Sequence, residues 1–320
     1  MRIDVHLHPG ELGRALREDV ERGLTMSPKE LPPKWFYDER GSQLFDQITR
    51  LPEYYPTRRE REILLARSHE IAATAAPDSL VELGSGTSEK TQILLDALVA
   101  NGSLRTFVPF DVSEQTLRDA SASIERAYSL DVHAVVGDFD RHLSEIPNGG
   151  RRLVAFLGGT IGNFGPDDRA RFLKELGASL APGDHLLIGF DLVKDVGRLE
   201  AAYNDSRGVT ADFNRNVLSV INRELDADFD LNAFEHRAFF DRDDSWIEMR
   251  LVARGEQRVR VEGLDLDVCF EDGEQMRTEI STKFMRDGIS TELIDAGFVP
   301  VSFWTDEADD FLLALAAISI

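Results

Sequence analysis

The sequence predicts an α/β protein with a Rossmann-like, mostly parallel sheet and a reversed final strand, joined to a second α+β domain. Apolar, strand-like runs alternate with helical segments from residue 58 to residue 193, as in βαβ units. After residue 193 this alternation stops, and helical stretches precede strand-like segments typical of an antiparallel sheet. We therefore expect one discontinuous sheet domain, residues 58–193 and 284–320, and a second domain, residues 1–57 and 194–283.

The elements follow from apolar periodicity and from the breaks between periodic segments. In the sheet domain, strands are expected at 79–83, 106–110, 132–136, 153–157 and 185–190, and helices at 60–75, 88–99, 114–128 and 166–180. The chain should close with a helix at 290–296 and strands at 299–304 and 311–318, whose short connection predicts an antiparallel hairpin at the edge of the sheet. Such a reversed final strand resembles the topology of class I methyltransferases.

The second domain is expected to combine helices with extended segments. Helices are predicted at 11–22, 197–206 and 209–225, and strands at 233–240, 245–254 and 257–270. The rest of the first 57 residues should be irregular but ordered, because linkers rarely carry so many prolines and aromatic rings.

Composition limits the class of partner. The chain has 320 residues, 42% of them hydrophobic, and a formal net charge of -22. A field of that sign repels nucleic acid and anionic lipid, which favours a small-molecule substrate. One cysteine, Cys269, fits a reducing compartment, and we expect neither a signal peptide nor a membrane span. These features predict a cytoplasmic protein that binds no nucleic acid and no membrane, and we expect it to be a monomer.

The most informative stretch is Leu80-Val81-Glu82-Leu83-Gly84-Ser85-Gly86, an apolar strand that ends in an acid-bearing, glycine-spaced turn. A dinucleotide-binding turn needs a third glycine three residues after Gly86, and Glu89 stands there instead. The turn resembles that of S-adenosylmethionine-dependent methyltransferases, whose cofactor has no phosphate. Lys90 is positioned to pair with the cofactor carboxylate, or it is an ordinary solvated helix lysine.

Polar residues follow the next strands, at the edge where ligands bind in open α/β sheets. Asp111 can accept hydrogen bonds from both ribose hydroxyls, or it caps the next helix. Asp138 can accept from the adenine amino group and Phe139 can pack on the purine, unless they are a turn acid and a core ring. Asn163 ends a loop with three glycines, where an amide would meet an acceptor amine.

Outside the sheet domain, four of the five tyrosines and one alternating segment draw attention: Tyr37, Tyr54, Tyr55, Tyr203 and residues 276–284. A tyrosine hydroxyl suits a zwitterion and its ring suits a cation, although core packing is the simpler interpretation. Glu279 and Ser281 share one face of an extended strand and can hold a polar ring, or they lie on a solvated edge. The seven histidines are scattered, so we expect no metal site.

Several motifs together identify a family resemblance over essentially the whole chain. They are residues 32–38, 41–49 and 51–58, the Glu82–Lys90 turn, Thr160-Ile161-Gly162-Asn163, Phe213-Asn214-Arg215-Asn216 and Glu279-Ile280-Ser281. These resemble the L-histidine Nα-methyltransferase of ergothioneine biosynthesis. The resemblance implies transfer of three methyl groups from S-adenosylmethionine to the histidine α-amine, giving hercynine (trimethylhistidine), by a methyltransferase domain and a substrate-binding domain.

The resemblance also implies a role for each matching residue. The cofactor would be bound by Gly84, Lys90, Asp111, Asp138 and Phe139. The amino-acid backbone of histidine would be held by Tyr54, Asn163 and Tyr203, and its imidazole by the strand Glu279, Ile280 and Ser281. Tyr37 would lie near the amine, so that Tyr37 and Asn163 are the candidate catalytic residues.

Three other functions compete with this one. The first is a methyltransferase of the same fold that acts on another amino acid or small amine. The second is a non-catalytic protein that binds the same cofactor. The third is a nicotinamide-dependent oxidoreductase, which the missing third glycine disfavours.

Overall fold

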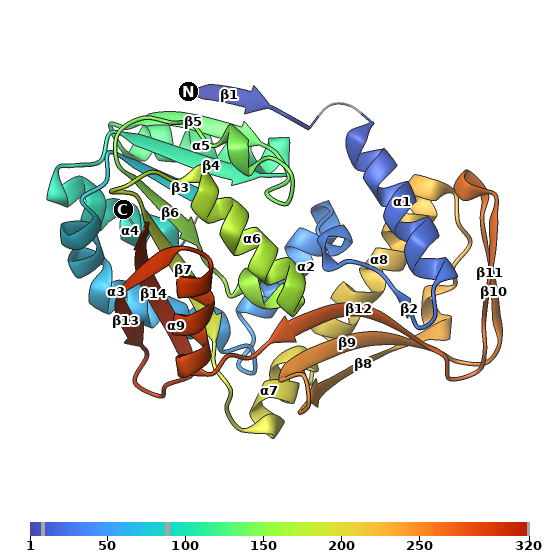
Figure 1. The fold of residues 1–320 in the computed structure, drawn as a ribbon. Helices are drawn as coiled ribbons and strands as arrows, with labels where there is room; N and C mark the ends of the chain where they lie inside the picture. The colour runs from blue at the N-terminus through green and yellow to red at the C-terminus, as the bar shows by residue number, and fades with distance from the viewer. Residues whose placement is uncertain (8–9, 87–89, 319–320) are drawn as a thin grey trace. The chain divides into compact units, whose positions relative to one another are not determined.

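The computed structural model describes residues 1–7, 10–86 and 90–318, and it divides the chain into two compact units (Figure 1). Unit 1 comprises Met1–His8, Pro56–Val193 and Phe284–Ile320, and unit 2 comprises Pro9–Tyr55 and Lys194–Lys283. The predicted start of the helix at residue 88, the residue Glu89 in place of a third glycine, and His8 lie outside the described residues.

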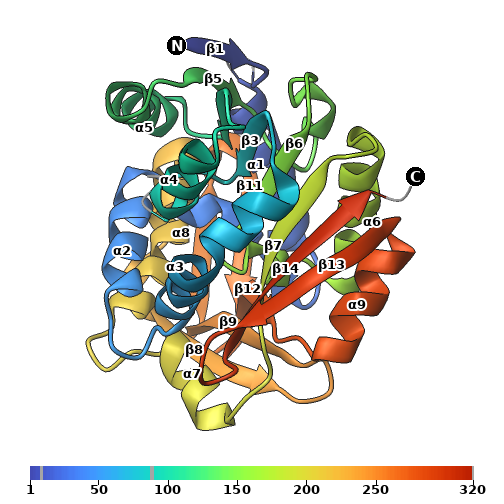
Figure 2. The ribbon, with the colours of Figure 1, turned by 90° about the vertical axis from the view of Figure 1, so that its left-hand side faces the viewer.

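Unit 1 contains an eight-stranded sheet with the order β1-β5-β4-β3-β6-β7-β14-β13. The strands are β1 (Arg2–Val5), β3 (Ser79–Leu83), β4 (Thr106–Asp111), β5 (Asp131–Val136), β6 (Arg152–Phe156), β7 (His185–Asp191), β13 (Phe298–Thr305) and β14 (Phe311–Ile318). β14 runs antiparallel to β7 and pairs antiparallel with β13 at the edge, so the predicted reversed final strand and hairpin are confirmed (Figure 2).

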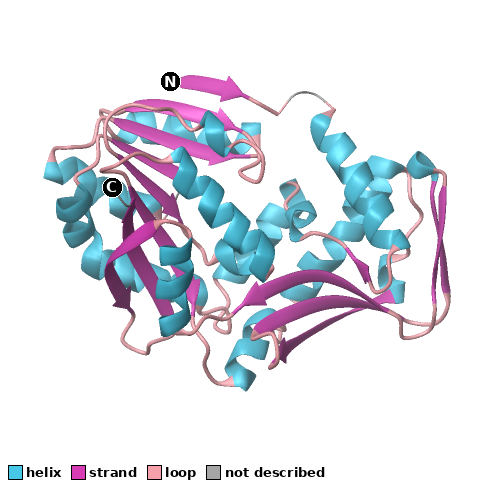
Figure 3. Cartoon of the chain, in the orientation of Figure 1, coloured by secondary structure: helices cyan, strands magenta, loops and turns pink. Residues whose placement is uncertain are grey.

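Helices pack on both faces of this sheet because every second strand residue presents an apolar side chain to one face. One core joins the sheet to α3 (Pro56–Ala75), α4 (Thr91–Asn101) and α5 (Glu114–Ala127). The other joins it to α6 (Pro166–Ser179) and α9 (Arg286–Asp295). Two short 3-10 turns, η2 (Leu143–Glu145) and η3 (Thr160–Asn163), follow strand ends. The alternation of helices and strands is visible in Figure 3.

The predicted domain division is wrong for the first residues of the chain, which belong to unit 1. The sequence predicts that residues 1–57 all belong to the second domain, but β1 pairs in parallel with β5 of unit 1, from Arg2 opposite His133 to Val5 opposite Val136. The Asp4 carboxylate also lies 2.7 Å from the His133 ring nitrogen, a side-chain contact between the two strands. A four-residue strand with two charged positions carries too little apolar pattern to be read from sequence.

Unit 2 is built on a four-stranded sheet, β2-β12-β9-β8. Its strands are β2 (Lys29–Glu30), β8 (Phe234–Asp241), β9 (Trp246–Ala253) and β12 (Gln275–Thr282), and a separate ribbon joins β10 (Gln257–Val261) to β11 (Leu266–Phe270). Its helices are α1 (Glu11–Thr25), α2 (Glu39–Thr49), α7 (Val196–Tyr203) and α8 (Val209–Leu225), with 3-10 turns η1 (Pro33–Phe36), η4 (Leu231–Ala233) and η5 (Glu262–Leu264).

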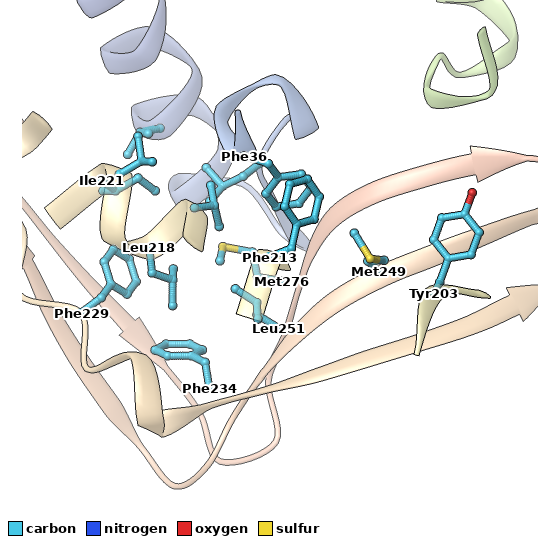
Figure 4. Packing of buried hydrophobic residues seen from close by; sticks show 14 of the residues in the cluster. Phe36, Tyr203, Phe213, Leu218, Ile221, Phe229, Phe234, Met249, Leu251 and Met276 are labelled. Atoms are coloured by element: carbon cyan, nitrogen blue, oxygen red, sulfur yellow. The ribbon is translucent and has the colours of Figure 1, made fainter. Parts of the chain in front are cut away.

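The core of unit 2 forms where α8 packs on the sheet (Figure 4). Phe213, Val217, Leu218 and Ile221 recur at helical spacing and are buried. On β9, Met249 and Leu251 alternate with residues of the other face. Burial of each such side chain contributes roughly 1.5–3 kcal/mol, so this core anchors the strands that carry polar residues. Figure 4 shows Tyr203 at one end of the labelled cluster, on the side of Met249.

Two sequence predictions for unit 2 are wrong. The strand predicted over 257–270 is a hairpin, because residues 262–264 form the turn η5 and Asp265 takes a left-handed conformation with φ of 51°. Helix α2 was missed, since its segment is largely polar and buries only Gly41 and Ile48. Within the described part of the chain, no helix is long and apolar enough to cross a membrane.

Candidate functional site

The glycine turn after β3 is shaped by its backbone. Gly84 and Gly86 have φ of 69° and 49°, a region in which residues with a side chain are strained. The Gly84 N–H donates to the carbonyl of Phe110 at 2.9 Å, which ties the turn to the end of β4. Among the described residues, a Cβ placed on Gly86 would meet nothing within 4 Å, so no described side chain closes this side of the turn. A ligand can therefore approach the backbone here.

Glu82 holds the turn from inside. Its carboxylate is buried and accepts hydrogen bonds from the hydroxyls of Ser85, at 2.9 Å, and Thr91. Hydrogen bonds to a buried carboxylate are strong, and they join the strand end to the first turn of α4. The acid that marks the motif in the sequence thus has a structural function in the turn.

Asp111 lies beside the glycine turn. One carboxylate oxygen accepts from the Gly86 N–H and the other from the Ser113 N–H, both at 3.0 Å. Burial raises the pKa of Asp111, and the N–H groups of Ser113, Gly86 and Val112 oppose that rise. The cap of α5 is the hydroxyl of Ser113. Each carboxylate oxygen keeps lone pairs for further donors such as two vicinal hydroxyls.

Asp138 and Phe139 follow β5. The Phe139 ring lies 3.9 Å from the position of a Cβ on Gly84, which places it against the glycine turn. It also contacts the rings of Phe156 and Phe172, at centroid distances of 5.5 and 6.0 Å. Phe139 therefore packs as a core ring beside the glycine turn, and its contact with the adenine stays a prediction. Asp138 accepts from the Asp140 N–H at 2.9 Å and is partly exposed.

Sequence reasoning missed Glu60, a fully buried carboxylate on α3. One of its oxygens accepts from the Lys90 ammonium, and the other accepts from the Gly158 N–H at 2.7 Å. Glu60 thus connects the residue predicted to meet the cofactor carboxylate with the loop after β6. No pattern around residue 60 marks this function, because the neighbouring arginines and glutamates are typical of a solvated helix.

The loop after β6 begins with Gly158 and Gly159, whose φ values are 83° and 71°, and continues into η3. Asn163 is the last residue of η3 and is partly exposed. Among the described residues its side-chain amide has no hydrogen-bond partner, so one donor group and one acceptor are available to a ligand.

In unit 2, Glu279 owes its orientation to a β-bulge. The pairing of β12 with β9 shifts between Arg277 and Glu279, which leaves Thr278 as an extra residue. Glu279 then pairs with Met249, on the core face of the sheet. Its side chain is 8% exposed, and burial raises its pKa to about 7, while the positive charge of Lys283 opposes that rise.

Lys283, Tyr203 and Ser281 form a triangle of hydrogen bonds. The Lys283 ammonium donates to the Tyr203 hydroxyl at 2.9 Å and to the Ser281 hydroxyl at 2.8 Å, and these hydroxyls are 2.7 Å apart. All three side chains are buried. Lys283 was not predicted, although it continues the alternation of residues 279 and 281 along the same segment.

A series of contacting aromatic rings connects Tyr203 of this triangle to Tyr37. Tyr203 contacts Tyr54 with ring centroids 6.3 Å apart, Tyr54 contacts Phe45 at 6.1 Å, and Phe45 contacts Tyr37 at 5.6 Å. Tyr37 is 40% exposed, whereas Tyr54 and Tyr203 are 8% exposed. Unit 2 thus brings three of its predicted tyrosines, Tyr37, Tyr54 and Tyr203, into one row with Phe45.

The predicted site residues fall into two groups, one per unit. Unit 1 carries Gly84, Lys90, Asp111, Asp138, Phe139 and Asn163, and unit 2 carries Tyr37, Tyr54, Tyr203, Glu279, Ile280 and Ser281. Ile280 is set apart from its neighbours, because it pairs with Glu248 and strand alternation turns its side chain to the other face. No three His, Cys, Asp or Glu side chains of the described residues are grouped as metal ligands would be.

Known proteins resemble the chain along its whole length. A protein of Mycobacterium tuberculosis named histidine N-alpha-methyltransferase is 59% identical over 320 residues, which cover 99% of this chain and 100% of the relative. A protein of the same name from Mycolicibacterium smegmatis is 58% identical over 97% of both chains. The ergothioneine biosynthesis protein 1 of Neurospora crassa is 32% identical over 73% of this chain and 29% of its own length.

The family model for histidine-specific, SAM-dependent methyltransferases matches residues 16–318. This match covers both units, and the sheet of unit 1 has the reversed final strand of class I methyltransferases. The chain therefore belongs to the family of histidine-specific, S-adenosylmethionine-dependent methyltransferases.

Proposed function

We propose that this protein transfers three methyl groups from S-adenosylmethionine to the α-amine of L-histidine and so forms hercynine, the first step of ergothioneine biosynthesis. The observation that carries this proposal is the 59% identity to a histidine N-alpha-methyltransferase over 99% of the chain. The buried carboxylate of Glu279 supports it, because a site for an apolar ring would not bury a titratable acid.

The residues of unit 1 fit the methyl donor. Gly84 and Gly86 leave the backbone accessible, and Asp111 would accept the ribose hydroxyls. Lys90 would pair with the cofactor carboxylate. Asp138 would accept a hydrogen bond from the adenine amino group, and Phe139 would pack on the purine. When bound, the cofactor supplies an electrophilic methyl group on sulfur.

The residues of unit 2 fit the acceptor. Glu279 would accept from an imidazole N–H, and Ser281 would hold the other ring nitrogen. Tyr54 and Tyr203 would bind the amino-acid backbone, together with Asn163 of unit 1. A site of this kind rejects side chains without an N–H, because the buried carboxylate would then stay unpaired.

The α-amine must be neutral to act as a nucleophile. Its reference pKa is roughly 8, so much of it carries a proton at neutral pH, and one proton must leave the nitrogen before each of the three transfers. The enzyme mainly orients the amine and excludes water. Tyr37 and its neighbouring rings would tolerate the permanent charge of the product by cation–π contact, which contributes about 0.5–2 kcal/mol.

The proposal is tested by mass spectrometry after the protein is mixed with S-adenosylmethionine and L-histidine. We expect a product with three added methyl groups, all assigned to the α-nitrogen by fragmentation. Histamine is the matched control, since it keeps the ring and the amine but lacks the carboxylate. An absence of methylated product, or methylation of a ring nitrogen, would contradict the proposal.

The proposal also includes a metal-independent monomer of the cytoplasm. The single cysteine, Cys269, supports a reducing compartment. Light scattering should give the mass of one chain, 35.8 kDa, and a chelator should leave the rate of methylation unchanged. A dimer mass or a chelator-sensitive rate would contradict that part of the proposal.

A further inference from the structure

Three polar side chains of unit 2 form a bridge between Tyr203, at the end of α7, and the β-bulge of β12. They are His236 of β8, Asn214 of α8 and Thr278. The His236 Nε2 lies 2.9 Å from the Tyr203 carbonyl oxygen, and its Nδ1 lies 2.9 Å from the Asn214 amide nitrogen. The Asn214 amide oxygen accepts from the Thr278 hydroxyl at 2.7 Å. Thr278 directly precedes Glu279, so the bridge connects the two residues proposed to hold opposite ends of the acceptor.

The direction of each bond in the bridge follows from its neighbours. A carbonyl oxygen only accepts, so the Tyr203 carbonyl requires a hydrogen on Nε2 of His236, and Nδ1 is then bare in the neutral ring. The Asn214 amide nitrogen also donates to the Arg250 carbonyl at 3.1 Å, which sets the orientation of the amide. Burial lowers the pKa of His236 and so favours the neutral ring. Every acceptor in the bridge therefore meets a donor.

The bridge is buried where it meets the sheet. Asn214 and Thr278 are almost completely buried, and the Thr278 hydroxyl also lies 3.0 Å from the Met249 carbonyl oxygen on β9. The loss of one bridge partner would leave a buried polar group unpaired, which is costly. The bridge therefore resists changes in the distance between its two ends.

The two ends of the Tyr203 residue are held separately. Its hydroxyl contacts Lys283 and Ser281, whereas the bridge holds its backbone carbonyl. A tyrosine anchored at both its backbone and its hydroxyl keeps a defined position relative to β12. It cannot shift to follow a ligand of another length without breaking buried hydrogen bonds.

We propose that the three bridge residues are specificity-determining positioning residues: by fixing the spacing between Tyr203 and Glu279, they make the site select the side-chain length of histidine. This inference rests on the proposed function and deepens it. An amino acid with the same imidazole and one more methylene would have its α-amine displaced when its ring is bound at Glu279. A displacement of roughly 1 Å at a reacting centre can lower the rate about hundredfold.

The test compares L-histidine with L-homohistidine, which has the same ring, α-amine and carboxylate and one more methylene. For the wild type we expect kcat/KM to be about hundredfold higher for histidine. Thr278→Val keeps the shape of the side chain but lacks the hydroxyl, and this ratio should fall to about tenfold or less, as one lost hydrogen bond allows. A wild type without a length preference, or a Thr278→Val variant that keeps the hundredfold ratio, would overturn the inference.

Further variants separate positioning from stability. Thr278→Ser restores the hydroxyl and should restore the ratio to about hundredfold, which a role in packing alone would not do. The matched control is Asn222→Ala on the same helix as Asn214, since the Asn222 amide forms two hydrogen bonds of 2.9 Å with the backbone of Phe229. Denaturant unfolding should show that this variant also loses stability, yet its ratio should stay close to the wild-type value.

An equal fall of the ratio in Asn222→Ala would overturn the inference, because general loosening of unit 2 would then explain the effect. If Thr278→Val does not fold by circular dichroism, His236→Phe replaces it with the same expectation. That variant keeps a ring but has no N–H for the Tyr203 carbonyl.

The outcomes separate this inference from the proposed function. A wild-type protein that methylates neither substrate contradicts the proposed function itself. A wild-type protein that methylates both equally well keeps the proposed function and loses only the selection of side-chain length.

Discussion

The carboxylate of Glu60 accepts a hydrogen bond from the backbone N–H of Gly158 at 2.7 Å, although the two residues are 98 positions apart. The second oxygen of the same carboxylate accepts from Lys90. Glu60 thus orients Lys90, which is proposed to bind the methyl donor. It also holds the loop that leads to Asn163, which is proposed to bind the methyl acceptor.

Glu60→Ala should lower the free energy of unfolding by about 1.5–3 kcal/mol, because a buried N–H and the Lys90 ammonium lose a charged acceptor. It should also weaken the binding of S-adenosylmethionine, since Lys90 is no longer held in place. Glu60→Gln keeps an acceptor for Gly158 and should be milder in both respects. Denaturant unfolding and calorimetric titration measure the two effects.

The matched control on the same helix is Glu70→Gln, which removes an exposed ion pair with Arg67. It should change the stability by less than about 1 kcal/mol. If Glu60→Ala were as stable as this control and bound the methyl donor normally, Glu60 would have no positioning role.

Asp111→Asn should raise KM for S-adenosylmethionine at least about tenfold and leave KM for histidine nearly unchanged. The amide keeps one acceptor oxygen, but a charged partner for two hydroxyls is lost, and such bonds contribute roughly 1.5–3 kcal/mol. Steady-state kinetics with each substrate varied separates the two constants. Asp119→Asn, on the exposed side of α5, is the control. Equal changes in both constants would argue against a specific role in cofactor binding.

Glu279→Ala should reduce kcat/KM for histidine by about tenfold or more and relax the selectivity towards apolar aromatic amino acids. The variant lacks the acceptor for the imidazole N–H, and it no longer buries an unpaired carboxylate against an apolar ring. Competition assays with histidine, phenylalanine and tryptophan measure the change. An unchanged kcat/KM for histidine would remove Glu279 from the ring site.

Glu279 should also make the stability of the ligand-free protein depend on pH. Its pKa rises from 4.5 to about 7 on folding, so the native state favours the protonated acid. The contribution of Glu279 to stability is therefore full below pH 4.5 and is lost as the pH rises through about 7. The 2.5-unit difference between 4.5 and about 7 corresponds to about 3 kcal/mol.

Glu279→Gln should consequently raise Tm at pH 8 and change it little at pH 4.5. Thermal unfolding of the ligand-free protein at the two pH values measures this. Glu235→Gln, an exposed acid on β8, should give no such difference. A Glu279→Gln variant without a Tm gain at pH 8 would show that the carboxylate is not destabilised by burial.

The sheet of unit 1 was largely predictable because its strands are continuous apolar runs that end in glycine or acid. Residues such as Gly84 and Asp111 could be assigned from their positions at strand ends. Helix α2 and strand β1 could not, since they owe their structure to partners far away in the chain rather than to a local apolar pattern. Glu60 and Lys283 were missed for the same reason, because a charged residue shows in sequence neither its burial nor its partner.

The β-bulge at Thr278 changes which residues of β12 face the core. Before it, Met276 faces the core; after it, Glu279 and Ser281 take that same face, which an unbroken alternation from Met276 would have given to Ile280. Core-facing side chains therefore fall on even-numbered positions before the bulge, where β12 stabilises unit 2. They fall on odd-numbered positions after it, where β12 is proposed to recognise the acceptor. Substitutions after the bulge can change the choice of acceptor without disturbing the packing of the residues before it. The bulge thus separates the evolution of selectivity from that of stability.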